Sequence, residues 1–195
     1  MANTTEHQFP NQSTNVANKS VLVVGGAGYI GSHISKHLIR NGYTPVIVDR
    51  NVKNNPIAKQ FNDCYEMDLP KDIHLLDNLV RRYNIDSCIC TAAYTSVPES
   101  VRDPIKYYQN NVVMTLQLLN KLKNLDVKKF IFSSSAAVYG VVEDGVCYDN
   151  SVGLEPINPY GQTKLVFEKI LKEYNKAYDI NSVSFRYFNA AGADP

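Results

Sequence analysis

The sequence predicts an α/β fold with a doubly wound parallel sheet, and three observations support this prediction. Short apolar runs alternate along the chain with amphipathic segments of helical period, which is the pattern of parallel strands joined by helices. A glycine-rich segment directly follows the first apolar run, at residues 21–24, as in a turn between a buried strand and a helix. With 195 residues, the chain can form one sizeable core. We therefore expect one domain over residues 20–195, preceded by a disordered polar tail over residues 1–19.

Six strands are expected at the short apolar runs, because turn signals separate them. Helices are expected after the first, third, fourth and fifth strands. The segment from about residue 104 to residue 125 is expected to form one long helix, whose apolar side chains recur at helical spacing and are assigned to the core. This stripe consists of Ile105, Tyr108, Val112, Leu116, Leu119 and Leu122, and the strands are expected at residues 20–25, 45–49, 63–66, 85–91, 128–134 and 181–186.

Charge and hydropathy argue against several classes of function. With 20 Lys and Arg residues against 19 Asp and Glu residues, the formal net charge is +1, which gives no electrostatic reason to bind nucleic acid or an anionic membrane. No apolar run approaches the roughly 20 residues that span a bilayer. The tail has the features of neither a signal peptide nor a transit peptide. We therefore expect a cytoplasmic protein that binds a small ligand.

The 4 cysteines lack the C-x-x-C spacing of a zinc or redox motif. They fall in or near expected strands, where buried free thiols of a reducing compartment are the simplest interpretation. Neither a disulfide framework nor a metal site is indicated. These cysteines are Cys64, Cys88, Cys90 and Cys147.

The glycine-rich segment indicates a phosphate-binding turn of the Rossmann type. Gly25 permits a tight turn, Gly28 lets the backbone approach a pyrophosphate, and Gly31 lets the following helix lie against the strand. The N-terminus of that helix would then direct its free N–H groups at the phosphates. The spacing is G-x-x-G-x-x-G, and the alternative is a glycine-rich turn without a ligand.

An acidic residue ends the second expected strand, at the distance typical of dinucleotide-binding folds. There the carboxylate of Asp49 would accept hydrogen bonds from the adenosine ribose, which favours NAD over NADP. The adjoining Arg50 leaves room for a 2′-phosphate, and the alternative is that Asp49 merely begins a turn. Asp68 and Leu69, after the third strand, are placed to contact the adenine or to form another turn.

A serine, a tyrosine and a lysine carry the predicted chemistry. Ser135 follows the fifth strand, at the carboxyl edge where open α/β sheets bind ligands. Asn158 and Pro159 are typical of a helix N-cap and first position, so Tyr160 and Lys164 would share one helix face. The ammonium, the positive charge of a cofactor and a low dielectric would together stabilise a phenolate, making Tyr160 a general base. Taken alone, such a pair is more often a solvated helix face.

Five segments of the chain resemble the extended short-chain dehydrogenase/reductases, and among them the UDP-glucose 4-epimerases. The resemblance runs from about residue 21 to residue 195. It implies a Rossmann domain that binds NAD and a C-terminal substrate domain that is missing from this sequence. The segments are GGAGYIGSH (25–33), ESVRDPIKYYQNN (99–111), FSSSAAVYG (132–140), NPYGQTK (158–164) and RYFNAAGADP (186–195).

The resemblance implies an isomerase that inverts C4 of a UDP-hexose, UDP-glucose or UDP-galactose, through a 4-keto intermediate. Tyr160 would take the C4 hydroxyl proton, Ser135 would relay it and Lys164 would stabilise the phenolate. Asn189 would approach the UDP-sugar together with Ser135 and Tyr160. The residues expected to hold NAD are Gly25, Gly28, Tyr29, Ile30, Gly31, Asp49, Asp68, Leu69, Ala92, Ala93, Asn110, Tyr160, Lys164 and Phe188.

The sequence leaves two alternative functions open. A 4,6-dehydratase would carry an acid/base pair directly after Ser135, where this chain has Ala136 and Ala137. A nucleotide-binding module without turnover would also explain a chain without a substrate domain. The resemblance departs at Cys90 and Thr95, where the epimerases usually carry His and Lys.

The same resemblance implies a homodimer formed by two helices of each chain. The helix after the fourth strand and the helix that bears Tyr160 would pair with their symmetry mates. The alternative is that both helices only pack on the sheet. The apolar residues expected at the two faces are Val113, Leu116, Leu165, Phe167 and Leu171.

Overall fold

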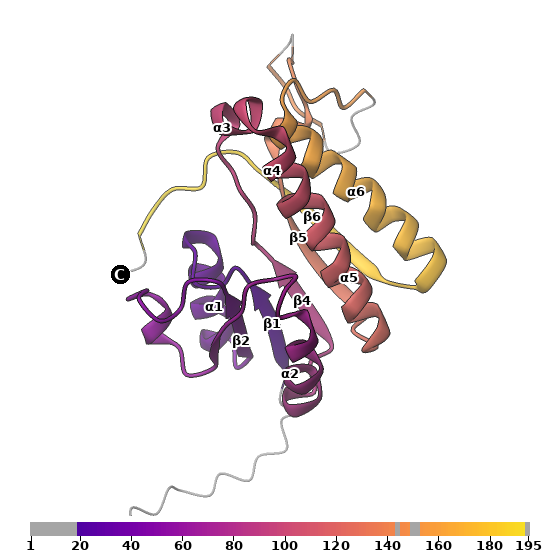
Figure 1. Ribbon diagram of the computed structural model, residues 1–195. Helices are drawn as coiled ribbons and strands as arrows, with labels where there is room; N and C mark the ends of the chain where they lie inside the picture. Colours follow the sequence, from indigo (N-terminus) through magenta and orange to yellow (C-terminus); the bar gives the residue numbers. More distant parts are fainter. Residues whose placement is uncertain (1–18, 143–144, 149–152, 194–195) are drawn as a thin grey trace, which may run out of the picture.

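Six parallel strands form one sheet in the computed structural model, which describes residues 19–142, 145–148 and 153–193. The strand order is β3-β2-β1-β4-β5-β6, so the direction of winding reverses between β1 and β4. This order confirms the doubly wound α/β fold (Figure 1). Residues 1–18 of the expected tail lie outside the described residues. The strands are β1 (Ser20–Val24), β2 (Thr44–Asp49), β3 (Cys64–Glu66), β4 (Ser87–Cys90), β5 (Lys129–Ser135) and β6 (Asn181–Tyr187).

All six strands were predicted, with differences only at their ends. The strand expected at residues 85–91 is the shorter β4. Ile85 is excluded because its N–H donates to the Val80 carbonyl at the end of the preceding helix. The last pair of the ladder is Val24 with Cys90, and the N–H groups of Thr91 and Ala92 both donate to the carbonyl of Val24, so the chain turns out of the strand there. These bonds draw the chain after β4 toward the end of β1.

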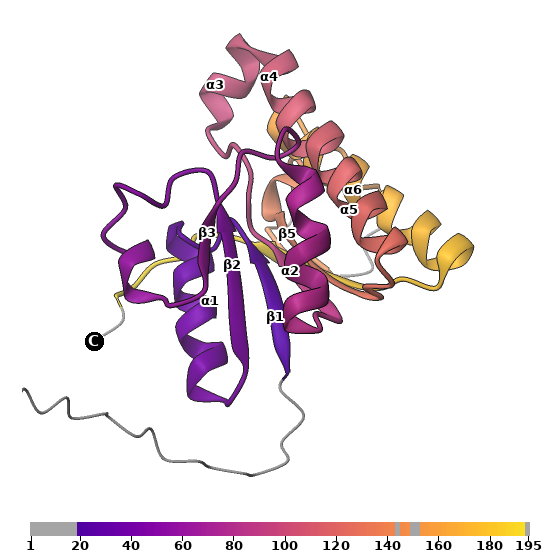
Figure 2. The same ribbon diagram turned by 60° about the horizontal axis from the view of Figure 1, so that its bottom comes forward.

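Helices cover the two faces of the sheet unequally (Figures 1 and 2). Helix α1 lies on one face, and α2, α5 and α6 lie on the other. Short helical segments connect them. The helices are α1 (Tyr29–Arg40), α2 (Leu76–Tyr83), α3 (Val97–Arg102), α4 (Pro104–Tyr108), α5 (Thr115–Asn124) and α6 (Pro159–Tyr178), with η1 (Ala58–Gln60), η2 (Ile73–Leu75), η3 (Gln109–Met114) and η4 (Ala136–Val138).

Each face of the sheet carries its own hydrophobic core, because successive side chains of a strand point to opposite faces. On β1, Leu22 belongs to the core under α2, α5 and α6, whereas Val23 belongs to the core under α1. Both side chains are fully buried. Burial of each such side chain contributes roughly 1.5–3 kcal/mol, so the centre of the sheet anchors the loops at its carboxyl edge.

The long helix expected over residues 104–125 is interrupted by the π-helical segment η3 between α4 and α5. A π turn shifts the helical phase, so the expected apolar stripe is wrong in its first half. Ile105 is 66% exposed and Tyr108 is 39% exposed, whereas Tyr107 and Asn111 are buried. The sequence pattern failed here because a polar side chain, Asn111, occupies the buried face.

Three of the apolar residues assigned to a dimer interface are instead buried within the chain. Leu165, Phe167 and Leu171 lie on the side of α6 that packs on the sheet and its loops. That prediction is therefore wrong for these residues. Val113 is 48% exposed and Leu116 is half-buried.

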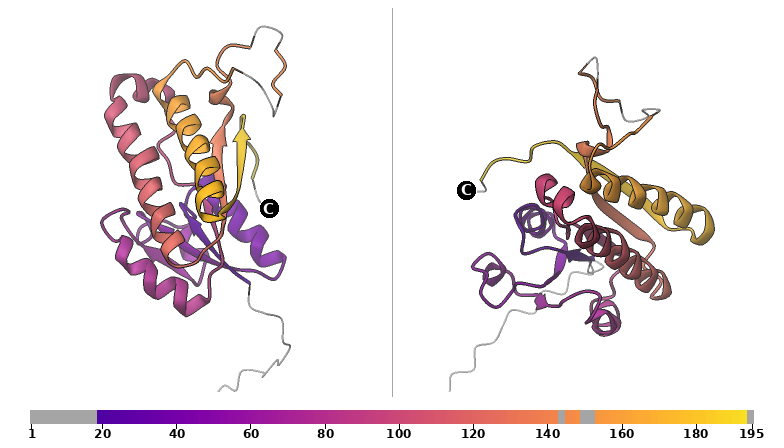
Figure 3. Two further views of the ribbon diagram at one scale, coloured as in Figure 1. Left: turned by 90° about the vertical axis from the view of Figure 1, so that its right-hand side faces the viewer. Right: turned by 45° about the horizontal axis from the view of Figure 1, so that its top comes forward.

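The sheet is covered on both faces at its centre but not at β6. Figure 3 shows α5 and α6 side by side on one face, with β6 at the edge of the sheet. On the opposite face of β6, Val183 is 51% exposed and Phe185 is 50% exposed. Within the described residues, no helix has both the length and the apolar character needed to cross a membrane.

Candidate functional site

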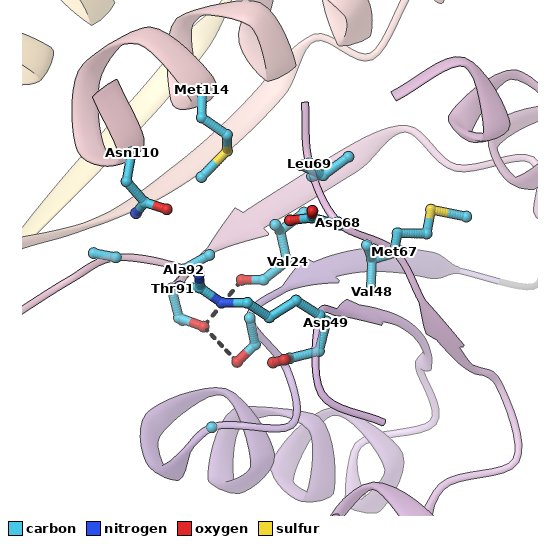
Figure 4. Close-up of a pocket in the computed structure, with 14 residues that line it drawn as sticks. Val24, Val48, Asp49, Met67, Asp68, Leu69, Thr91, Ala92, Asn110 and Met114 are labelled. Atoms are coloured by element: carbon cyan, nitrogen blue, oxygen red, sulfur yellow. Dashed lines mark hydrogen bonds between the residues drawn. The ribbon is translucent and has the colours of Figure 1, made fainter. Parts of the chain in front are cut away.

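Two adjoining cavities lie at the carboxyl ends of the strands, on either side of the loop that follows β4. Both are lined by Thr91 and Ala93. The first, here named the glycine-turn pocket, is lined by Val24, Gly25, Gly28, Val48, Asp49, Arg50, Met67, Asp68, Leu69, Thr91, Ala92, Ala93, Asn110 and Met114 (Figure 4).

The second cavity, here named the Tyr160 cleft, contains the predicted catalytic residues. Ser135, Tyr160 and Lys164 line it together with Tyr29 and Ile30 of the glycine-rich turn. Its other lining residues are Thr91, Ala93, Thr95, Val97, Ser133, Ser134, Ala136, Ala137, Tyr187, Phe188, Asn189 and Ala190. Every predicted site residue except Gly31 therefore lines one of the two cavities.

The glycine-rich turn is tight because its backbone contacts neighbouring loops directly. Gly25 has φ +81°, and a Cβ placed there would lie 2.6 Å from the backbone nitrogen of Ala92. A Cβ on Gly31 would lie 2.3 Å from the Gly25 carbonyl oxygen. Gly31 lines neither cavity, and its expected place among the cofactor-binding residues stays a prediction. Its small size allows α1 to begin directly against the turn.

Helix α1 begins with an N-terminus that points toward the glycine-rich turn. Gly28 is its N-cap, and within the described residues no side chain caps its first turn and that turn contains no acidic residue. The first N–H groups of a helix lack intrahelical acceptors and carry the positive end of the helix dipole. An anion bound at the turn would accept hydrogen bonds from these N–H groups and would be attracted by the positive end of the dipole.

Asp49 at the end of β2 is held in place by two backbone groups. Its Oδ2 accepts a hydrogen bond from the Ala27 N–H at 3.1 Å, and its Oδ1 accepts one from the Asn51 N–H at 3.1 Å. A carboxylate has about four acceptor positions, so Asp49 keeps acceptor capacity for a ligand. Figure 4 shows Asp68 and Leu69 next to each other at the edge of the pocket.

Two polar residues that the sequence reasoning missed organise the loop after β4. The Thr91 hydroxyl lies 3.0 Å from the carbonyl oxygens of both Val24 and Gly25. The amide of Asn111 accepts from the Tyr94 N–H at 2.9 Å and donates to the Tyr94 carbonyl at 2.9 Å. An asparagine at a core position of a helix was the available signal, since buried polar groups need partners.

The π-helical segment η3 brings Asn110 to the pocket and joins it to the Tyr160 helix. Asn110 donates to Asn111 Oδ1 at 3.0 Å, and Asn111 Nδ2 lies 3.2 Å from the Thr163 hydroxyl oxygen. Thr163 in turn donates to the Tyr160 carbonyl at 2.7 Å. Hydrogen bonds between side chains thus link the loop after β4, η3 and α6.

Tyr160 is placed by the start of α6, as predicted. Asn158 is the N-cap, its side chain accepts from the Gly161 N–H at 2.8 Å, and Pro159 is the first helical residue. The Tyr160 side chain is mostly buried, with the ring of Tyr107 edge-on at 6.5 Å between centroids. Burial raises the pKa of Tyr160, and a hydrogen bond with Ser135 opposes that rise.

Lys164 lies one helical turn after Tyr160, with its ammonium deep in the protein. Its Nζ donates to the Ser133 carbonyl at 2.6 Å and lies 5.9 Å from the Tyr160 ring centroid. Burial lowers the pKa of Lys164 to about 8. Desolvation disfavours the charged form of both groups, so burial by itself does not stabilise the Tyr160 phenolate, and the joint effect expected of Lys164, a cofactor charge and a low dielectric stays a prediction.

A third side chain of the same helix face ties α6 to the end of β5 and β6. Glu168 is buried and accepts from the Ser134 hydroxyl at 2.5 Å. It also pairs with the guanidinium of Arg186 at 2.8 Å. Lys164 therefore binds the backbone of Ser133, and Glu168 binds the side chain of Ser134. These two contacts fix the end of β5 beside Tyr160.

The two positions that depart from the family resemblance lie at the end of β4 and in the loop that follows it. Cys90 is buried at the end of β4, where burial raises the pKa of its thiol to about 11 and the nearby Lys164 opposes that rise. Thr95 lines the Tyr160 cleft without a charge. All four cysteines are free thiols, but only Cys88 and Cys90 are buried, whereas Cys64 and Cys147 are partly exposed; the expectation of buried thiols is therefore wrong for the latter two.

The sequence was compared with models of known protein families. Residues 21–195 match the model of the NAD dependent epimerase/dehydratase family. This chain belongs to that family. The matched residues include the lining of both cavities and every predicted site residue. The similarity therefore extends over the whole site and is not limited to short motifs.

Curated relatives and solved structures agree with this family. The chain is 44% identical over 176 residues to a UDP-glucose 4-epimerase of Halalkalibacterium halodurans, covering 90% of this chain and 52% of the relative. Of the solved structures, the UDP-glucose 4-epimerase of Brucella ovis in complex with NAD has a TM-score of 0.84 and 43% identity over 90% of this chain and 54% of that one.

A further solved structure shows that the similarity extends to epimerases with other names. A UDP-N-acetylglucosamine 4-epimerase from Methanobrevibacter ruminantium, in complex with UDP-N-acetylmuramic acid, has a TM-score of 0.78 and 34% identity, covering 90% of this chain and 56% of that one. The chain spans about half the length of the curated relatives it matches.

Proposed function

We propose that this chain binds NAD in the glycine-turn pocket and supplies the catalytic groups for epimerisation at C4 of a UDP-hexose. The observation that carries the proposal is the position of Ser135, Tyr160 and Lys164 in a cleft that adjoins the pocket through Thr91 and Ala93. A dinucleotide lying across both cavities would place its reactive ring beside the tyrosine.

The residues of the pocket fit the parts of NAD. The uncapped N-terminus of α1 suits the pyrophosphate, and the fixed carboxylate of Asp49 suits the ribose hydroxyls. Asp68 and Leu69 border the space beyond the ribose, which suits an adenine. NAD held by these residues would supply the hydride acceptor and donor that inversion at C4 requires.

Proton transfer is assigned to residues of the cleft. Tyr160 takes the proton of the C4 hydroxyl and returns it after the 4-keto sugar has turned over, and Ser135 orients or relays that proton. Because burial raises the pKa of Tyr160, its phenolate requires a nearby positive charge. Among the described residues that line the cleft, Lys164 supplies that charge, and its hydrogen bond to the Ser133 carbonyl holds it there.

The UDP-sugar is proposed to enter the cleft from the side of Phe188 and Asn189, which follow β6 and are exposed. Recognition of the uridine and the choice between glucose and galactose are assigned to the half of the relatives' length that this chain does not span. A 4,6-dehydratase is disfavoured because Ala136 and Ala137 line the cleft directly after Ser135, and methyl groups transfer no protons. A binding module without turnover is excluded if the test below succeeds.

The test is epimerisation of UDP-galactose by the protein extended through its downstream coding sequence, with UDP-glucose formation as the readout. Tyr160→Phe should lower turnover by several orders of magnitude while NAD stays bound, because it removes the proton acceptor. Ser135→Ala should lower turnover by roughly 10²–10⁴-fold, as for one acid/base group. Tyr174→Phe deletes the same hydroxyl outside the cleft on the same helix and should leave turnover unchanged. Near-normal turnover in Tyr160→Phe would rule out the proposed base.

We also propose that the protein is a homodimer in the cytoplasm. Since Leu165, Phe167 and Leu171 are buried within the chain, the proposed interface is moved to the exposed apolar side chains of α3, α4 and η3. These are Val101, Ile105 and Val113. Paired helices of two chains would cover them.

A further inference from the structure

Arg50, the residue after Asp49, is held by a tyrosine from a distant part of the chain. Its guanidinium donates to the Tyr94 hydroxyl at 2.7 Å, and its central carbon lies 4.7 Å from the centroid of the Tyr94 ring. Arg50 lines the glycine-turn pocket at the end of β2, whereas Tyr94 belongs to the loop after β4. The contact therefore joins the two sides of the pocket.

Tyr94 is a fixed partner and not a mobile surface group. The side-chain amide of Asn111 bonds to both the N–H and the carbonyl of Tyr94, each at 2.9 Å. The Lys106 ammonium lies 4.5 Å from its ring centroid, and the buried ring of Tyr107 lies 5.8 Å away. Because these contacts fix Tyr94, the position of Tyr94 determines where the Arg50 guanidinium lies.

The position of Arg50 matters for the choice of cofactor, an argument that rests on the proposed binding of NAD. A guanidinium beside the acidic residue at the end of β2 is the group that accommodates a ribose 2′-phosphate in NADP-binding folds. Here Tyr94 occupies that guanidinium with a hydrogen bond and a cation–π contact. The guanidinium keeps other N–H donors, but the two contacts hold it at the position of Tyr94 and away from the space beside Asp49 where a 2′-phosphate would lie.

We infer that Tyr94 is a specificity-determining residue that withholds Arg50 from a 2′-phosphate and so keeps the pocket selective for NAD. Asp49 alone disfavours the additional negative charge, and Tyr94 removes the cation that would offset it. The competing interpretation is that the contact only staples the loop after β4 to β2. A staple would affect NAD and NADP equally, whereas withholding Arg50 affects NADP alone.

The experiment is calorimetric titration of the chain with NAD and with NADP. Tyr94→Phe removes the hydroxyl and keeps the ring, and should strengthen NADP binding by about threefold. Tyr94→Leu removes both contacts and should strengthen it by about tenfold. NAD affinity should stay within about twofold in both variants. The gain should disappear when Arg50→Ala is added to either variant, because the released guanidinium is its source.

Tyr108→Leu is the matched control, since Tyr108 is an exposed tyrosine of the same helical segment as Tyr107 and should change neither affinity. Unchanged NADP affinity in both Tyr94 variants, parallel changes for the two cofactors, or a gain that survives Arg50→Ala would each overturn the inference. If Tyr94→Leu loses NAD binding because the loop is disturbed, Tyr94→Phe decides the question, because it retains the packing of the ring. Failure of the unchanged chain to bind NAD would instead overturn the proposed function.

Discussion

The buried charge of Lys164 reduces the stability of the fold, and the proposed function assigns the same charge a role in catalysis. Its side chain is 3% exposed, and its ammonium donates to the carbonyl of Ser133. Burial lowers its pKa from 10.5 to about 8, so near neutral pH the folded protein holds a charge that the interior disfavours. A cation beside Tyr160 is what the proposed phenolate needs, and the stability lost is the consequence of placing it there.

This burial predicts a specific pH dependence of stability. Below about pH 8 both folded and unfolded chains hold the Lys164 proton, and the buried charge destabilises the fold. Between about pH 8 and 10.5 the unfolded chain holds more protons, so the free energy of unfolding rises with pH through this window. The free energy of unfolding of the unchanged protein, minus that of Lys164→Met, should rise by about 1 kcal/mol per pH unit in this window.

Urea unfolding of both proteins from neutral pH to about pH 9 measures this difference. Both proteins carry Cys90→Ala, because the Lys164 charge lowers the pKa of the Cys90 thiol and replacement of the lysine would otherwise change that thiol as well. The Cys88 thiol, whose pKa burial raises, then acts equally in both proteins. Parallel pH profiles for the two proteins would show that Lys164 is not the group responsible.

Among single residues, those with a local signal could be predicted from the sequence and those that act across the chain could not. The glycines of the turn, Asp49 and the Tyr160–Lys164 pair follow from spacing and from their position after a strand. Asn111 and the contact of Arg50 with Tyr94 depend on partners that are 17 to 52 residues away in the chain. Spacing along one element carries no information about such partners.

At the scale of elements, the position of the Tyr160 helix depends on how closely it approaches the loop after β5. Gly161 follows Tyr160, and a Cβ placed there would lie 2.5 Å from the Ala137 carbonyl oxygen and 2.9 Å from Pro156 Cβ. The absence of a side chain thus lets α6 begin against η4. Tyr160 and Ser135 meet because of this approach.

Gly161→Ala should therefore destabilise the protein by about 1–3 kcal/mol, as for overpacking of a tight contact. The sign is informative, because alanine in a helix is ordinarily favoured over glycine by about 1 kcal/mol. Thermal or urea unfolding measures the change. Lys169→Ala, at an exposed position of the same helix, should stay within roughly 0.5 kcal/mol. A Gly161→Ala protein as stable as the parent would contradict the close approach.

The order and type of the elements were predictable because alternating apolar and amphipathic runs report local burial. The π-helical turn and the buried face of η3 were not, because Asn111 is buried only in the company of Tyr94 and Thr163. The dimer face of α6 was assigned wrongly for a related reason. Apolar residues such as Phe167 show that a helix face is buried, but not whether the sheet or a second chain buries it.

At the scale of the whole molecule, exposed apolar side chains lie on the short helices after β4 and on the edge strand β6. Val101 and Ile105 project from α3 and α4, and Val183 projects from β6. If the helical surface is the dimer interface, light scattering at tens of micromolar should give the mass of two chains. Ile105→Asp should then give one chain, and Val183→Asp should leave the dimer intact. A monomeric unchanged chain would contradict the proposed dimer.

We propose that the glycine-turn pocket, whose described lining residues belong to this chain, binds NAD without the half of the relatives' length that the chain does not span. The decisive measurement is calorimetric titration of residues 1–195 with NAD and NADP. We expect NAD to bind more tightly than NADP, and Asp49→Ala to weaken NAD binding and to narrow the difference. Asp86→Ala, which removes an exposed ion pair with Lys129, should bind as the unchanged chain does. No measurable NAD binding, or Asp49→Ala binding NAD as tightly as the unchanged chain, would contradict the account.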